Sequence, residues 1–141
     1  MEEMRIEISD SLSANEYNYL REQVGWESKN PIVVEKVIKN STFVKKAVYD
    51  NCIVGMARAI GDGMSYLLVD VVVSSKYQKK GIGKQLVNSI IEEVKGSTLY
   101  GEYSTISLIS IKGMEKFYEN CGFEAMPFGY NGNGMRIRIE N

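Results

Sequence analysis

Histidine is absent from this chain of 141 residues, and cysteine and proline occur only twice each. Without an imidazole, the Ser-His-Asp and Cys-His nucleophile systems, the zinc-protease helix and histidine-ligated metals are all excluded. Cys52 and Cys121 give neither a disulfide framework nor a zinc-ligand spacing, so we expect two small buried side chains and no metal site. Any acid or base must therefore be Asp, Glu, Lys, Tyr or Cys.

An excess of charge of either sign is also missing. The 17 Lys and Arg residues against 18 Asp and Glu give a net charge of −1, which argues against a dedicated nucleic-acid binder. No apolar run approaches the roughly 18 residues that would span a membrane, and the sequence starts with acidic residues where a secretory signal would be basic. We therefore predict a cytoplasmic protein with no nucleic-acid or membrane partner.

Apolar periodicity and turn signals predict a mixed fold. No linker-like stretch divides the chain, so we expect a single domain over residues 1–141. The expected strands cover 4–8, 43–49, 52–60, 64–73, 105–111, 123–128 and 135–139, and the expected helices cover 13–23, 31–40, 81–94 and 114–121. This order indicates one mixed sheet covered by helices, an α/β (α+β) class. The nearly continuous apolar run over 66–73 predicts a strand at the centre of the sheet, covered on both faces.

The segment after that strand has the composition of an anion-binding site. Lys76, Lys79 and Lys80 supply positive charge, and Gly81 and Gly83 open an amphipathic helix. A helix start presents unpaired N–H groups and the positive end of the helix dipole, and glycines let an oxygen-rich group approach the backbone. A pyrophosphate fits such a place, and the alternative is a solvated basic turn.

Two nucleotide-binding motifs fail on this segment. The P-loop needs Gly at 78 and Ser or Thr at 85, and both positions are Gln. The dinucleotide fingerprint needs a third Gly at 86, where Leu86 belongs to the apolar face of the helix. Neither motif therefore accounts for the glycines.

The hexapeptide Gln78-Lys79-Lys80-Gly81-Ile82-Gly83 resembles the coenzyme A motif Q-x-x-G-x-G of the GNAT superfamily of acetyltransferases. The resemblance extends upstream to Asp70-Val71-Val72-Val73 and downstream to residues 117–123, which look like the family's F-Y-x-x-x-G-F signature. It implies a single mixed, mostly antiparallel sheet of about seven strands flanked by four helices, with central strands that splay apart to hold acetyl-CoA.

The resemblance also implies roles for individual residues. The backbone of the strand end would pair with the pantetheine arm and the acetyl carbonyl, and the amides of the loop would hold the pyrophosphate. The implied acetyl-CoA-binding residues are Val71, Val72, Val73, Gln78, Lys79, Lys80, Gly81, Ile82, Gly83 and Lys84. Tyr118 matches the family tyrosine that donates a proton to the departing thiolate, whereas its spacing with Phe117 and Cys121 also fits a core aromatic. Ile111 stands where many members carry an Asn that contacts the coenzyme arm.

Asp70 is the one charge in an apolar strand, so it needs a partner or a raised pKa. If the turn at 61–63 sets the register, Arg58 faces Tyr66 and lies roughly 13 Å from Asp70 at ~3.3 Å per residue. Asp70 is then a candidate catalytic base, with a structural ion pair as the alternative. Trp26 and Arg58 are candidate acceptor-binding residues, the alternatives being a core tryptophan and a surface charge.

We therefore predict an acetyl-CoA-dependent N-acetyltransferase that transfers an acetyl group directly to a primary amine of a small molecule. Acetylation of a protein N-terminus or lysine is the main alternative, and non-catalytic acyl-CoA sensing is an alternative from another class. Related folds often dimerise, so the resemblance is also compatible with a homodimer.

Overall fold

The computed structural model describes residues 4–140, which divide into two units, Met1–Leu108 and Ile109–Asn141. In the first unit the elements are β1 (Glu7–Ser9), α1 (Ala14–Gln23), α2 (Pro31–Lys39), β2 (Phe43–Tyr49), β3 (Cys52–Gly61), β4 (Ser65–Val73), a 3-10 turn (Ser75–Tyr77), α3 (Ile82–Ser97) and β5 (Thr105–Ser107). The second unit contains α4 (Glu115–Asn120). No helix within residues 4–140 is long and apolar enough to cross a membrane.

Side-chain caps fix the starts of the first two helices where the sequence predicts them. The Ser13 Oγ accepts from the Glu16 backbone N–H at 3.1 Å, and the Glu16 carboxylate accepts from the Ser13 N–H at 2.9 Å. Asn30 caps α2 by accepting from the Ile32 N–H at 2.9 Å, with Pro31 as the first helical residue. Both predicted helices are confirmed to within a residue at these ends.

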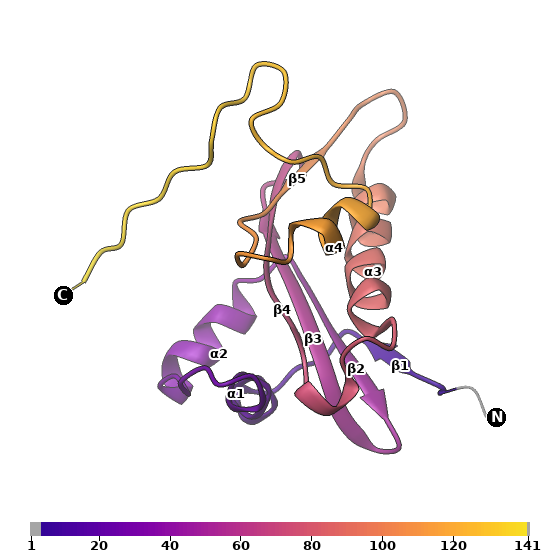
Figure 1. Cartoon of the computed structure of the whole chain (residues 1–141), viewed down its shortest axis with the longest axis vertical. Coiled ribbons are helices and arrows are strands. Elements are labelled where there is room, and N and C mark those ends of the chain that lie inside the picture. The colour runs from indigo at the N-terminus through magenta and orange to yellow at the C-terminus, as the bar shows by residue number, and fades with distance from the viewer. Residues whose placement is uncertain (1–3, 141) are drawn as a thin grey trace. The chain divides into compact units, whose positions relative to one another are not determined.

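The sheet of the first unit has the strand order β1-β2-β3-β4-β5. The first three neighbouring pairs are antiparallel and β4–β5 is parallel, so a mixed α/β fold is confirmed. Helices α1 and α2 cover one face and α3 covers the other (Figure 1). The predicted place of β4 is wrong by one position, because β3 is the middle strand.

Each face of the sheet has its own apolar contacts. On the α1 side, the buried cluster consists of Leu12, Tyr17, Leu20, Val34, Met56 and Val72. On the other side, α3 buries Ile82, Leu86, Val87, Ile90 and Val94. Gly55 lets α3 approach the sheet, since a Cβ there would lie 2.9 Å from Leu86 Cδ1 and 3.0 Å from the Val72 carbonyl oxygen. The close approach fixes the start of α3 against the end of β4.

A β-bulge in β4 changes which of its side chains face which layer. Met56 pairs with Val72 and Arg58 pairs with Val69, so β4 has one residue more than β3 between these pairs. Before the bulge, Tyr66 stacks on Phe43, on the α3 side; after it, Val72 packs in the cluster on the α1 side. The predicted two-sided burial of this apolar strand therefore arises in part from a change of buried face.

The end of the chain differs from the sequence expectation. The described residues 4–140 contain five strands instead of about seven, because the predicted hairpin of 123–128 and 135–139 does not form. A single bridge between Phe128 and Asn131 is present instead. The predicted strand over 105–111 shortens to three residues. Alternating apolar residues in the last segment remain exposed, as Met135, Ile137 and Ile139 show.

Candidate active site

The open edge of β4 is the first component of the site. Strand β5 pairs with β4 only from Ser65 to Leu67. From Leu68 to Val73 no strand among the described residues pairs with β4 on that side, so its N–H and C=O groups are available to another extended group. The predicted acetyl-CoA contacts at Val71, Val72 and Val73 belong to this stretch.

The loop that follows β4 is tied to its surroundings at both ends. Ser75 Oγ donates to the Gln23 carbonyl at 2.7 Å, which joins the loop to α1. Gln78 Nε2 donates to the Val73 carbonyl at 3.0 Å. The predicted site residue Gln78 thus holds the loop against the end of β4 with its side chain.

The start of α3 lacks the caps that the first two helices have. Its N-cap is Gly81, at φ 83°, and no side chain among the described residues caps it. The first hydrogen bond of the helix runs from the Gln85 N–H to the Gly81 carbonyl. The amides of Ile82, Gly83 and Lys84 come before it, so they have no acceptor within the helix. Lys79, at φ 62°, and its neighbour Lys80 are exposed beside these amides. The arrangement suits an anion with several oxygens.

Arg58 and Asp70 form an ion pair, so the expected separation of these residues is wrong. Arg58 Nε lies 2.7 Å from Asp70 Oδ2, and the two side chains are 15% and 16% exposed. The expected register is wrong because the last pair between β3 and β4 is Gly61–Tyr66. Arg58 therefore pairs with Val69 rather than with Tyr66. The structural ion pair considered for Asp70 is therefore present, and Arg58 is not a surface charge.

The sequence analysis missed Tyr17, whose hydroxyl donates to the same oxygen of Asp70 at 2.6 Å. Burial, and then the Asp70 carboxylate, raise the pKa of Tyr17, so the phenol remains a neutral donor. The signal for a partner was the polarity of Asp70 in an apolar strand. The sequence did not identify this partner as Tyr17, because Tyr17 fits the pattern of any aromatic residue on the buried face of α1.

Trp26 follows α1 and contributes to its packing. The Arg21 guanidinium lies 5.2 Å from the centre of the indole ring, and Trp26 packs, half-buried, against the α1-side cluster. Its surroundings therefore combine a core contact with a partly exposed face.

Tyr118 lies in α4, in the second unit. Its ring makes edge contacts with Phe117 and Phe123, at centroid distances of 4.9 Å and 5.9 Å. Burial, with a smaller contribution from the charge of Cys121, raises the pKa of Tyr118. The phenol therefore keeps its proton at neutral pH, as a proton donor must.

Of the two cysteines expected to be buried, Cys52 is exposed and Cys121 is half-buried.

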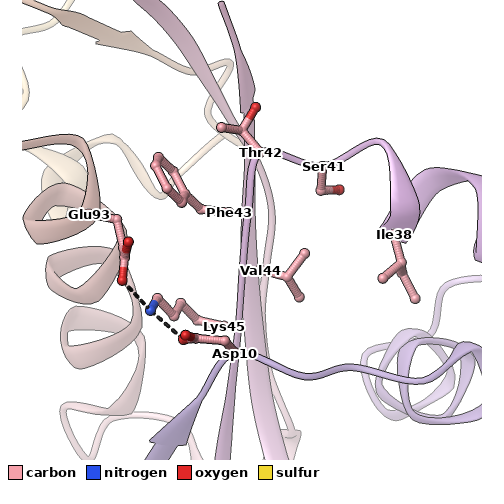
Figure 2. A pocket seen from close by; sticks show the side chains of 8 residues that line it. All are labelled: Asp10, Ile38, Ser41, Thr42, Phe43, Val44, Lys45 and Glu93. Carbon is pink, nitrogen blue, oxygen red and sulfur yellow. Dashed lines mark hydrogen bonds and ion pairs between the residues drawn. The ribbon is translucent and has the colours of Figure 1, made fainter. Parts of the chain in front are cut away.

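A separate pocket of about 280 Å³ lies at the edge of β2. Figure 2 shows Lys45 in this pocket between Asp10 and Glu93, at 2.5 Å and 2.9 Å. Burial alone lowers the pKa of Lys45, but its hydrogen bonds to the two carboxylates outweigh burial and raise it. None of the predicted site residues is among those that line this pocket, so we treat the cluster as structural.

Comparison with known proteins defines the class of this protein. Residues 13–138 match the family model of the acetyltransferase (GNAT) domain, so the chain belongs to that family. It is an acetyltransferase of the GNAT type, which confirms the fold and the enzyme class inferred from the coenzyme A motif.

Individual relatives agree with this assignment. The protein named "Uncharacterized N-acetyltransferase ycf52" of Pyropia yezoensis is 31% identical over 140 residues, covering 91% of this chain and 78% of its own. The histone acetyltransferase TAP1 of Glycine max is 30% identical over 125 residues, covering 80% of this chain and 52% of its own. A crystal structure of a probable acetyltransferase from meticillin-resistant Staphylococcus aureus has a TM-score of 0.82 at 25% identity, covering 96% of this chain and 100% of its own.

Proposed function

We propose that this acetyltransferase takes the acetyl group from acetyl-CoA and transfers it directly to a primary amine of a small molecule. The observation that carries the proposal is the continuity of the unpaired edge of β4 with the uncapped start of α3. An extended, hydrogen-bonding arm followed by a diphosphate matches these two features in order. Acetyl-CoA supplies the activated acetyl group and has both parts.

The residues that would hold it act mainly through their backbone. The strand end at Val71–Val73 provides amides and carbonyls for the pantetheine arm, and the amides of Gly81–Lys84 provide donors for the pyrophosphate. Lys79 and Lys80 are exposed next to those donors and add charge. Because these contacts are backbone contacts, we expect substitutions at the glycines to affect binding more than substitutions at the lysines.

The chemistry needs a proton donor and a place for the amine. We assign Tyr118 as the general acid for the departing thiolate, because its phenol keeps its proton at neutral pH. Asp70 is the candidate acceptor of a proton or hydrogen bond from the amine. Tyr17 and Arg58 both bind Oδ2, and no donor among the described residues binds Oδ1, which leaves that oxygen available. No covalent enzyme intermediate is needed, since holding the two reactants together supplies most of the acceleration.

Trp26 and Arg58 are the proposed acceptor-side residues. Trp26 has a partly exposed ring beside α1, whereas Arg58 is mostly covered and acts through the carboxylate it binds. Acetylation of a protein amine is the second candidate, and the similarity to a histone acetyltransferase favours testing it. A cytoplasmic location, a homodimer, and the lack of nucleic-acid and membrane partners stay predictions.

Thiol release from acetyl-CoA tests the proposal. Polyamines, aminoglycosides, amino acids and short peptides should be compared as acceptors at equal concentration. We expect release above the rate of hydrolysis with at least one class of small amine. Release with peptides only would replace the small-molecule acceptor by a protein one. Tight acetyl-CoA binding without release for any acceptor would contradict the proposed reaction.

A further inference from the structure

Side chains from separate elements converge on one carboxylate oxygen inside the first unit. Asp70 Oδ2 accepts from the Tyr17 hydroxyl at 2.6 Å and from Arg58 Nε at 2.7 Å. Arg58 Nη1 also donates to Ser41 Oγ at 3.3 Å, just beyond the end of α2. Tyr17 is 5% exposed, so its bond to Asp70 is shielded from water. The carboxylate therefore links α1 and β3 to β4.

Asp70 is also the residue at which β4 departs from regular geometry. Its φ is 41°, in the left-handed region, which is unfavourable for a residue with a side chain. It lies in the bulge, between the pairs Arg58–Val69 and Met56–Val72. A conformation of this kind persists only when its surroundings hold it, and the bonds from Tyr17 and Arg58 are the contacts that do so.

The bulge sets the direction of the strand that follows it. In β4 the next residues are Val71–Val73, whose backbone groups lie on the unpaired edge. A change in the φ of Asp70 would rotate these amides and carbonyls as a unit. The Gln78 bond to the Val73 carbonyl would move with these groups, whereas the Ser75 bond to Gln23 would still tie the loop before α3 to α1.

We propose that Tyr17 is a positioning residue for acetyl transfer, because its hydroxyl, together with Arg58, holds Asp70 in the bulge and so aims the backbone of Val71–Val73. The inference rests on the proposed function, in which that backbone contacts the acetyl end of acetyl-CoA. Tyr17 contributes to the reaction through Asp70 only. Its ring has an independent role in the α1-side cluster.

Tyr17→Phe separates these two roles, since it removes the hydroxyl and keeps the ring. We expect kcat to fall about tenfold, as for a reacting group that is displaced by a fraction of an ångström. The dissociation constant of ADP, which has a diphosphate but no pantetheine arm, should be unchanged within error in calorimetry, because the pyrophosphate donors are untouched. Tyr19→Phe is the matched control on the same helix, where the tyrosine is 46% exposed, and it should alter neither quantity.

A double-mutant cycle shows whether Tyr17 acts through Asp70. In an Asp70→Ala background, Tyr17→Phe should cause no further loss of kcat. Should that background fold poorly by thermal unfolding, Asp70→Asn is the second choice, in which the effect of Tyr17→Phe should shrink. Equal losses in both backgrounds, or a wild-type kcat for folded Tyr17→Phe, would overturn the positioning role alone. No thiol release by the wild-type protein with any amine would overturn the proposed function and the positioning role together.

Discussion

Replacing Gly81 by Ala tests the proposed pyrophosphate site at a single backbone position. Gly81 is the N-cap of α3 at φ 83°, and no described atom lies within 4 Å of the Cβ that the substitution would add. The new methyl group therefore meets no steric obstacle, and its effect comes from the backbone conformation alone. An alanine in the left-handed region costs about 1–2 kcal/mol, partly offset by about 0.4–1 kcal/mol from a less flexible unfolded chain. We expect a net loss of about 1 kcal/mol, or about 3 °C in Tm for a chain of this length.

The same substitution should weaken acetyl-CoA binding, because relief of the strain turns the first amides of α3 away from the phosphate. The loss of one hydrogen bond to a charged group is worth about 1.5–3 kcal/mol, which corresponds to a dissociation constant raised about 10- to 100-fold. Calorimetric titration with acetyl-CoA and thermal unfolding would be run on the same samples, so that affinity and stability are compared directly.

Two further glycines provide matched controls. Gly63, at φ 102° in the turn before β4, also has no atom within 4 Å of an added Cβ among the described residues. Gly63→Ala should therefore lower Tm by a similar amount and leave affinity unchanged. Gly96 lies inside α3 without a positive φ, so Gly96→Ala should raise stability by about 0.5–1 kcal/mol. Equal affinities of Gly81→Ala and Gly63→Ala for acetyl-CoA would refute the placement of the pyrophosphate at α3.

Three further predictions concern the remaining charges and the proposed acid. Tyr118→Phe should lower kcat about 100-fold with little change in acetyl-CoA affinity. In the wild-type protein, the raised pKa of Tyr118 predicts that kcat falls only at a pH above the ordinary tyrosine value of 10.0. Burial alone would raise the pKa of Glu16, but its hydrogen bonds outweigh burial and lower it. The Glu16 carboxylate therefore stabilises the folded protein fully above the pKa that Glu16 has in the unfolded chain, and this stabilisation is lost as the pH falls through the pKa in the folded protein. Glu16→Gln should therefore flatten the acid side of a plot of Tm against pH, and an unchanged slope would contradict this. Lys45→Met should lower the free energy of unfolding in urea by about 1–3 kcal/mol, because Lys45 is 6% exposed. Lys95→Met, which removes an exposed ion pair, should lower it by less than about 0.5 kcal/mol. Equal losses would contradict the structural role of Lys45.

Features fixed by neighbouring residues were the most accessible to prediction. The caps at Ser13 and Asn30 depend on a few consecutive residues, and both form as expected. The uncapped start of α3 was visible as two glycines after a basic loop, because backbone conformation there is a local requirement. Tyr17 and Asp70 are 53 positions apart, so no short pattern links them.

Pairing between strands was the least accessible. The register of β3 and β4 depends on the length of the loop between them and on a bulge, and neither changes the apolar pattern in a recognisable way. The segment 135–139 shows the converse case. Its residues alternate in polarity, yet a strand needs a partner to satisfy its backbone, and in the described residues this segment has none.

The extra residue in β4 makes this strand sensitive to length. Upstream of it the even-numbered side chains of Tyr66 and Leu68 lie on the α3 layer, and downstream Val72 lies on the α1 layer. Loss of Asp70 would restore uniform alternation and keep Val72 opposite Met56, so the last three valines would stay on their present faces. A deletion after the bulge, with the bulge kept, would instead invert the end of the strand, whereas a deletion in a surface loop would only shorten a connection.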